Sequence, residues 1–217
     1  MKRAIVLAIS VILALGVAAP IAAGQNQSHS NILKELAAQW WNWAVLEPSP
    51  LVGDYGVDDP QCKGEFVEGV FFLSGTTGGD ATRTCTVPAD TALFFPVVAA
   101  VCSEAPTVPT DGGFTGDPEP YGKCAKELVD SGLMDGDPYA TLDGEDLTIR
   151  RIGSKPFMWT FTEESTVVPS VPVGSYDAET YGLWVYLPQG LKPREDPYTV
   201  QFGGVFGIDT TYTLFAV

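Results

Sequence analysis

The sequence predicts a mainly β fold, a β-sandwich of the jelly-roll or immunoglobulin-like kind, with an N-terminal helix and one short additional helix. Two observations lead to this expectation. Short apolar or alternating segments follow one another from Phe66 to the C-terminus, and turn-forming residues separate them in a chain with 23 Gly and 17 Pro. Only two segments have a helical pattern, and no repeat or linker divides residues 25–217, so one domain is expected.

Each of the two helices is predicted from its end signals. The stretch ILKELAAQWWNWAVL predicts a helix over residues 31–46, because Ser30 or Asn31 can cap its start and Pro48 follows its end. The stretch KCAKELVDSG, residues 123–132, predicts the short additional helix, which ends at its glycine.

The three tryptophans of the first helix divide into two groups. On a helical wheel that starts at Ile32, Leu36, Trp40 and Trp43 fall within about 80° of it. Trp40 and Trp43 are therefore expected in the core, where they dock the helix on the main body. Trp41 falls about 180° from Ile32, at the edge of this stripe or outside it, which makes it the ring expected to contact a ligand.

Strands are predicted beyond Pro50, where the apolar period shortens to about 2. The predicted strand segments are residues 66–74, 85–87, 91–101, 142–152 after an initial turn, 157–162, 181–188, 198–204 and 211–217, the last two as a pair. Residues 76–83 are expected to form a turn, and Pro96 implies a bulge or a sheet edge. Arg150 and Arg151 are adjacent on a strand, so they point to opposite faces, and unless the strand is a sheet edge, one of them is expected to need a carboxylate partner.

The N-terminus has the layout of a secretory signal peptide over residues 1–24. Lys2 and Arg3 precede an apolar run from Ala4 to Val17, and small residues follow. We therefore expect a mature chain that begins near Gln25, is secreted or displayed at the cell surface, and has no stable membrane span. An uncleaved anchor is the alternative, because residues 4–23 carry no charge and could nearly span a bilayer.

The charge of the chain excludes one class of partner. The 12 basic and 27 acidic residues give a net charge of −15, and loss of the signal removes two basic residues and leaves −17. A protein this acidic repels phosphate backbones, so no nucleic acid partner is expected. The expected partner is an extracellular ligand or protein.

Four cysteines remain after export, Cys62, Cys85, Cys102 and Cys124, and their even number predicts two disulfides. Of the three pairings, the favoured one joins the first two and the last two, because each bond then closes a local segment. Zinc binding is the competing interpretation. It is disfavoured because the chain has no C-x-x-C motif and a single histidine, His29, so no cofactor is expected.

Calcium is the one metal that the sequence brings into consideration. The stretch MDGDPYATLDGED holds five carboxylates, Asp135, Asp137, Asp143, Glu145 and Asp146, and calcium prefers such oxygen ligands on loops. The stretch does not match an EF-hand loop, and Asp-Gly and Asp-Pro pairs are ordinary turn formers. A calcium site therefore stays a secondary expectation here.

Several motifs together resemble a group of exported microbial proteins that have no assigned activity. The motifs are WWNW near the start, CTVPADTALFFPV, TLDGEDL, and the closing PYTVQFGGVFGIDTTYTLFAV. The resemblance covers most of the mature chain and implies export and a sandwich-like fold. EDPYTV stands where the group has a Gly-His pair, so this chain lacks that histidine.

The residues favour binding over catalysis. A single histidine disfavours Ser-His-Asp and Cys-His sites, and no P-loop is present. The leading expectation is a non-catalytic domain that binds an extracellular ligand or partner. The alternatives are a secreted carboxylate-dependent, glycosidase-like hydrolase, with or without calcium, and a structural component of the cell envelope.

Overall fold

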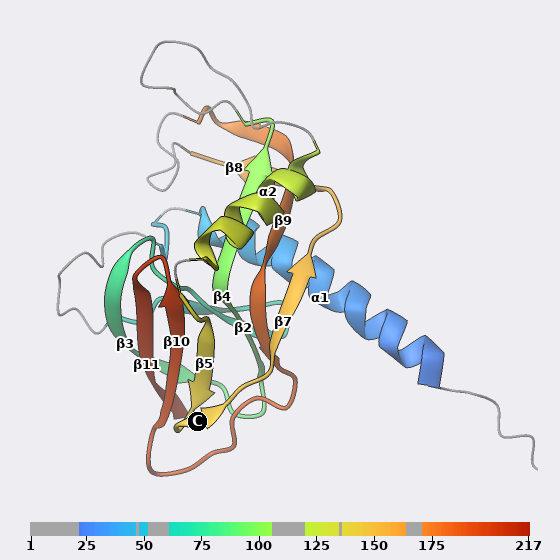
Figure 1. Cartoon of the computed structure of the whole chain (residues 1–217). Helices are drawn as coiled ribbons and strands as arrows, with labels where there is room; N and C mark the ends of the chain where they lie inside the picture. Colours follow the sequence, from blue (N-terminus) through green and yellow to red (C-terminus); the bar gives the residue numbers. More distant parts are fainter. Residues whose placement is uncertain (1–21, 47, 52–60, 106–119, 135, 164–170) are drawn as a thin grey trace, which may run out of the picture.

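The computed structural model describes residues 22–46, 48–51, 61–105, 120–134, 136–163 and 171–217 (Figure 1). Their fold is mainly β, with two helices and two mixed sheets. The elements in chain order are α1 (Ala22–Ala44), β1 (Gly64–Val67), β2 (Val70–Leu73), β3 (Gly79–Val87), β4 (Ala92–Ser103), α2 (Tyr121–Gly132), β5 (Tyr139–Leu142), β6 (Glu145–Asp146), β7 (Ile149–Gly153), β8 (Phe157–Phe161), β9 (Gly174–Leu187), β10 (Tyr198–Val205) and β11 (Ile208–Ala216).

Each sheet combines antiparallel pairs with one parallel pair. The larger sheet has the strand order β1-β2-β4-β9-β7, and β8 pairs with the first part of β9. The smaller sheet has the order β3-β11-β10-β5-β6. The parallel pairs are β2 with β4 and β3 with β11, and the expected pairing of the last two strands, β10 with β11, is confirmed.

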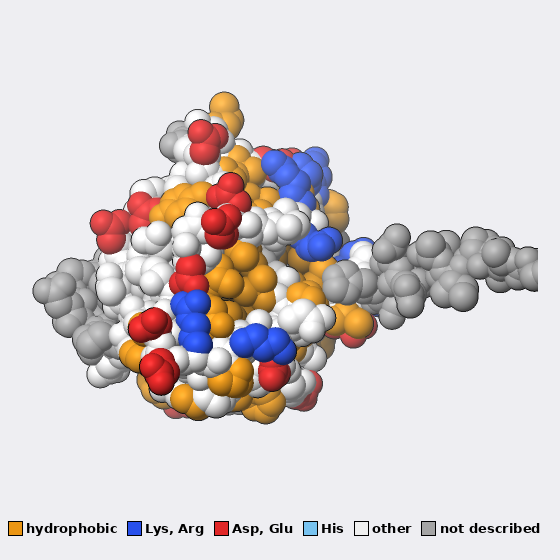
Figure 2. Space-filling model, turned by 90° about the horizontal axis from the view of Figure 1, so that it is seen from below, with side chains coloured by type: hydrophobic (Ala, Val, Ile, Leu, Met, Phe, Trp, Pro, Cys, Tyr) orange, Lys and Arg blue, Asp and Glu red, His pale blue; other side chains and the backbone are white. Residues whose placement is uncertain are grey.

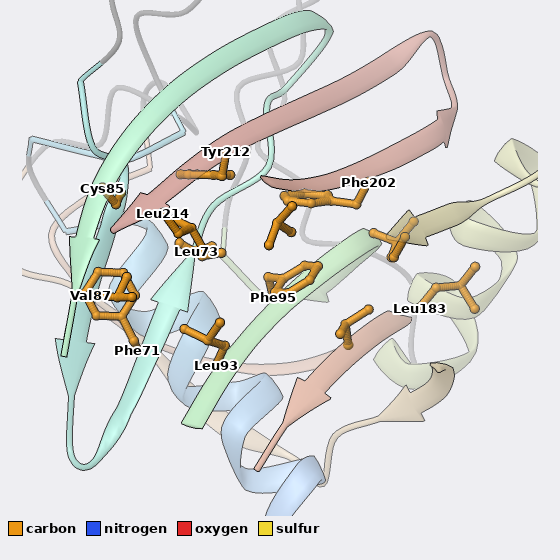
Figure 3. Packing of buried hydrophobic residues seen from close by; sticks show 14 of the residues in the cluster. Phe71, Leu73, Cys85, Val87, Leu93, Phe95, Leu183, Phe202, Tyr212 and Leu214 are labelled. Carbon is orange, nitrogen blue, oxygen red and sulfur yellow. The ribbon is translucent and has the colours of Figure 1, made fainter. Parts of the chain in front are cut away.

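The larger sheet is buried on both faces. One face packs on the smaller sheet, with the rings of Phe95 and Phe202 4.7 Å apart (Figure 3). The other face packs on α1, where the ring of Phe94 stacks on Trp184. Neighbouring residues of a strand point to opposite faces, and both faces of β4 are buried. Consecutive residues of β4 therefore need apolar side chains, which explains its continuous apolar run.

Pro96 marks a β-bulge, which is one of the two alternatives that the sequence left open. The register of β4 against β9 shifts between Pro96 and Val98, so that Pro96 pairs with Trp184 and Val98 with Leu183. Proline has no N–H to donate to a ladder, and a bulge accommodates that loss in a central strand.

The expectation of one strand over residues 66–74 is wrong, because this run forms the β1–β2 hairpin. Glu68 and Gly69 are its turn, with φ values of 47° and 93°. Both central residues of such a tight turn need positive φ, which glycine adopts at no steric cost. The expected turn over residues 76–83 is also too long, since β3 begins at Gly79.

The helix α1 begins at Ala22, earlier than the expected start at residue 31. Ser30 and Asn31 are therefore helical residues rather than caps. The preceding AAGQNQ continues the helix because it contains no proline and two alanines, which have the highest helix propensity. Within the part of the chain that the structure describes, no helix is long and apolar enough to cross a membrane.

Both expected disulfides are present. Cys62–Cys85 ties the segment before β1 to β3, and Cys102–Cys124 ties β4 to α2. The sequence separations of 23 and 22 residues correspond to about 3 kcal/mol of chain-entropy stabilisation per bond. Two disulfides and no free cysteine indicate a protein that folds outside the reducing cytoplasm.

Charged side chains are dispersed over the surface. On the face shown in Figure 2, acidic side chains alternate with basic ones and with exposed apolar side chains. This arrangement agrees with the sequence, in which no long run of like charge occurs.

Tyr139, at the start of β5, has a strongly raised pKa. Partial burial of the phenol raises its pKa to about 12, and the hydrogen bond that its hydroxyl donates to Asp209 Oδ1 over 2.8 Å adds to the effect. Since the folded-state pKa exceeds the unfolded value of 10.0, the stabilisation from this group is complete below pH 10 and is lost as the pH rises through 12. Ring-carbon NMR shifts of Tyr139 are expected to titrate near pH 12, and titration near pH 10 would contradict this account.

Candidate functional site

An apolar hollow lies beside the bulge of β4, and we call it the bulge pocket. Its volume is about 340 Å³. The described residues that line it are Trp40, Trp41, Leu51, Gly75, Thr76, Thr77, Pro96, Val97, Val98, Ala99, Phe206 and Ile208. None of these side chains is charged, although the chain carries a net charge of −15.

The bulge pocket exists because β2 is shorter than β4. The pairing of these strands ends at Phe72 with Phe94, and beyond Leu73 the chain turns away through Gly75. Strand β4 continues to Ser103, so β2 does not cover its edge from the bulge onward. The pocket therefore lies beside the edge of β4 that β2 leaves uncovered, where backbone groups of β4 can form hydrogen bonds.

The tryptophans of α1 form one wall. The indole of Trp40 donates a hydrogen bond to the carbonyl of Leu73 over 2.9 Å, and the indole of Trp41 donates one to Thr180 Oγ1 over 2.7 Å. The Thr180 hydroxyl in turn donates to the carbonyl of Ala100, just after the bulge. These bonds hold the Trp40 ring to the end of β2, and they hold the Trp41 ring to β9 and, through Thr180, to β4.

Trp41 is not the exposed ring that the helical wheel suggested, because its exposed fraction is only 9%. The buried residues of α1 begin at Leu33 and cover an arc of about 160°, whose centre lies about 100° from Ile32. Ile32 itself is 44% exposed, so it was the wrong origin for the wheel. Trp40 and Trp43 are buried as expected. Ligand contact by Trp41 stays a prediction, now through the pocket wall.

The tip of the β10–β11 hairpin forms the opposite wall. Phe206 has a positive φ of 55° at this turn, and it lines the pocket together with Ile208. A Cβ atom added at Gly132, the last residue of α2, would lie 1.9 Å from the Phe206 ring. The absence of a side chain at Gly132 therefore lets the hairpin tip dock on α2.

A buried arginine fixes the floor next to the pocket. Arg83 is fully buried, and its Nη1 donates hydrogen bonds to the carbonyls of Ser74 and Gly75 over 2.7 and 3.1 Å. The same atom donates to the hydroxyls of Ser74 and Tyr212, each over 2.8 Å. Burial raises the pKa of Tyr212, which keeps its hydroxyl protonated, so that it can donate to the carbonyl of Lys63 over 2.9 Å while it accepts from Arg83. The sequence contained a pattern that could have predicted the burial of Arg83. This residue lies two residues from both Ala81 and Cys85 on β3, so it points inward with them.

The candidate calcium ligands do not assemble in the part that the structure describes. Asp135 lies outside the described residues, and no group of three or more potential metal-binding side chains is found within them. The carboxylate of Asp143 accepts hydrogen bonds from the Thr199 amide and from Arg194, each over 2.8 Å. Asp143 thus joins two loops of the fold. Glu145 and Asp146 are exposed on β6.

A wider groove at the end of α1 holds two carboxylates. Its volume is about 580 Å³, and Glu65 and Glu68 line it beside Trp43 and Leu46. Glu65 Oε2 accepts a hydrogen bond from the Trp43 indole over 2.8 Å, and Glu68 Oε2 accepts one from Gln39 over 3.3 Å. Each carboxylate therefore has one oxygen engaged in holding α1 to the β1–β2 hairpin.

Comparison of the chain with protein-family models, with curated proteins and with solved structures finds no match. Its function is therefore argued from the geometry of these sites.

Proposed function

We propose that this protein is a secreted or cell-surface, non-catalytic domain that binds a small apolar ligand in the bulge pocket. We further propose that its two sheets form a β-sandwich of the jelly-roll or immunoglobulin-like kind. The observation that carries the functional proposal is a tryptophan-walled pocket with no charged side chain among its described lining residues, in a protein with a net charge of −15. The two disulfides support the extracellular location.

The composition of the pocket supports the ligand class. Ligand pockets are mostly apolar, with a few polar groups that fix orientation, and volumes of roughly 300–1,000 Å³ suit small molecules. The bulge pocket holds about 340 Å³, and Thr76 and Thr77 supply its hydroxyl groups. A neutral apolar molecule would bury its surface against Trp40, Trp41 and Ile208 without desolvating a charge.

The two alternatives keep weaker support. A carboxylate-dependent hydrolase would need an acid and a base that face one cleft, and Glu65 and Glu68 are its best pair among the described residues. One oxygen of each is already bonded to α1. A structural envelope component would need an uncovered edge. The smaller sheet ends at β6, which is only two residues long, and at β3, which is nine residues long and is tied to the segment before β1 by the Cys62–Cys85 disulfide.

The proposal predicts saturable binding of a neutral fluorescent probe, N-phenyl-1-naphthylamine, to the intact disulfide-bonded protein. Ala99→Leu places about three extra carbon atoms on the pocket wall and is expected to weaken binding about tenfold or more. Phe206→Ala removes the opposite wall and is expected to weaken it as well, with little effect on folding because this ring is half exposed.

Ala100→Leu is the matched control, because its neighbour Ala99 lines the pocket whereas Ala100 packs on the sheet–sheet core. Probe titration by fluorescence, with thermal unfolding to confirm the fold of each variant, makes the measurement. Equal binding by the wild type and both wall variants would contradict the proposal.

A further inference from the structure

A second hollow, which we call the flank pocket, lies where α1 crosses β7. Its volume is about 320 Å³. The described residues that line it are Ser30, Leu33, Lys34, Arg150, Arg151, Ile152 and Gly153. Three of these seven residues are cationic and none is acidic, in a chain with 12 basic and 27 acidic residues.

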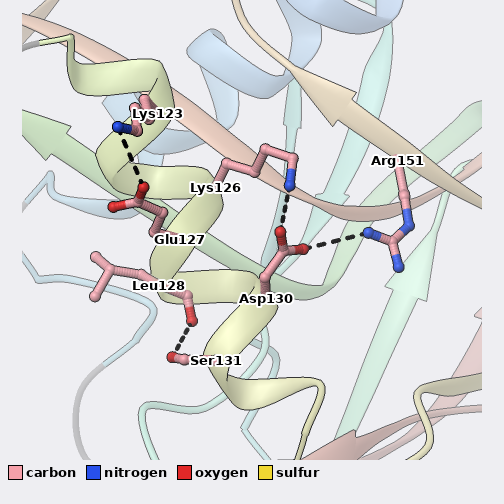
Figure 4. Close-up of polar contacts among 7 residues, drawn as sticks. All are labelled: Lys123, Lys126, Glu127, Leu128, Asp130, Ser131 and Arg151. Carbon is pink, nitrogen blue, oxygen red and sulfur yellow. Dashed lines mark hydrogen bonds and ion pairs between the residues drawn. The ribbon is translucent and has the colours of Figure 1, made fainter.

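The two arginines have different surroundings, as expected from their opposite faces. Ile152 is buried in the core beneath α1, so Arg150, two residues earlier on β7, shares the α1 face. Arg151 points toward α2, where its guanidinium lies 3.3 Å from Asp130 Oδ1 (Figure 4). Asp130 also pairs with Lys126, so this carboxylate is shared between two cations.

Arg150 and Lys34 are left without a counter-charge. Within the described residues neither forms an ion pair or a hydrogen bond. The nearest acidic residue on α1, Glu35, lies 3.9 Å from Lys155 instead. Two unpaired cations that line one hollow repel each other, and an anion bound between them would replace this repulsion with attraction.

We propose that the flank pocket binds the phosphate group of a phosphate ester. The planar guanidinium of Arg150 can donate two parallel hydrogen bonds to phosphate oxygens, and the ammonium of Lys34 supplies a second positive charge. The hydroxyl of Ser30 offers a further donor. Leu33 and Ile152 line the same hollow, which has room for the organic part of the ester beside the phosphate.

This site is separate from the bulge pocket, and it does not conflict with the expectation, drawn from the charge of the chain, that no nucleic acid binds. The net charge of −15 repels an extended polyphosphate backbone at long range, whereas a single phosphate senses mainly the local cations within a Debye length of about 10 Å at moderate salt. The phosphate could belong to a free ester or to a lipid headgroup. The shared chemistry is the phosphate group, and the two sources are distinguished by experiment.

The test titrates the intact protein with glycerol 3-phosphate, followed by NMR signals of the Arg150 and Lys34 side chains at low and at moderate salt. A parallel arm measures binding to phosphatidylglycerol vesicles against phosphatidylcholine vesicles. Arg150→Gln and Lys34→Gln are each expected to weaken binding about tenfold or more. Both residues are exposed at the surface or nearly so, and the variants should fold normally.

Lys192→Gln is the control, because it removes the same charge from an exposed ion pair with Asp90 outside the flank pocket. Saturable binding in either arm that is lost in the two pocket variants and kept in the control supports the proposal, and the arm that responds identifies the source. Absence of saturable binding in both arms, or an equal loss in Lys192→Gln, would overturn it.

Discussion

Replacing Trp40 with alanine is expected to lower the free energy of unfolding by about 3–5 kcal/mol, a typical cost for removing a buried tryptophan. The ring is 2% exposed and forms edge contacts with three other tryptophans, Trp41, Trp43 and Trp184, at centroid distances of 5.2, 5.9 and 5.6 Å. Its indole also satisfies the carbonyl of Leu73 at the end of β2. The substitution therefore leaves both a cavity and an unpaired buried carbonyl.

Chemical denaturation followed by circular dichroism measures this effect. Ile32→Ala is the control on the same helix, because Ile32 is 44% exposed and its truncation is expected to change stability by less than about 0.5 kcal/mol. If Ile32→Ala lowered the free energy of unfolding as much as Trp40→Ala does, the buried stripe of α1 would include Ile32. That result would contradict the packing of α1 on the larger sheet.

Replacing Arg83 with methionine is expected to destabilise the fold by about 3–5 kcal/mol, because several buried acceptors lose their donor and each unsatisfied group costs about 1–3 kcal/mol. Methionine has a similar length, so the loss comes from hydrogen bonds more than from volume. The carbonyls of Ser74 and Gly75 and the hydroxyl of Tyr212 would lose the donor that now joins the loop after β2 to β3 and β11.

The control for this prediction is Arg150→Met, the same change at an exposed arginine that has no partner among the described residues. Its effect on the free energy of unfolding is expected to be near zero. A small effect of Arg83→Met in urea denaturation, similar to that of the control, would mean that the loop and β11 are held by other contacts.

Local signals in the sequence were enough for much of the fold. The continuous apolar run of β4 predicted a strand buried on both faces, which is present, and the proline within it predicted either a bulge or a sheet edge, of which the bulge is present. The disulfide pairing followed from sequence separation, since Cys62 is close in the chain to Cys85 and Cys102 to Cys124.

Features that depend on several elements were not predicted. The turn at Glu68 and Gly69 was missed because the apolar residues on its two sides looked like one strand. The position of Trp41 depends on which arc of α1 faces the sheet, and the sequence of an isolated helix does not define that arc. The bulge pocket combines α1, the loop after β2, the bulge of β4 and the β10–β11 hairpin tip, which are far apart in the chain.

The two proposed sites suit two different kinds of ligand. The bulge pocket offers uncharged walls to an apolar molecule, whereas the flank pocket offers unpaired cations to a phosphate group. They share α1, since Trp40 and Trp41 line the first and Leu33 and Lys34 line the second. The packing of α1 on the larger sheet thus positions both sites.

The location of a bound apolar molecule is the central claim, and intermolecular NOEs between N-phenyl-1-naphthylamine and the protein measure it most directly. The account predicts NOEs from the probe to Trp41, Val97 and Ile208 on three walls of the bulge pocket. NOEs that instead place the probe against Leu46 and Val67 in the groove at the end of α1 would contradict it.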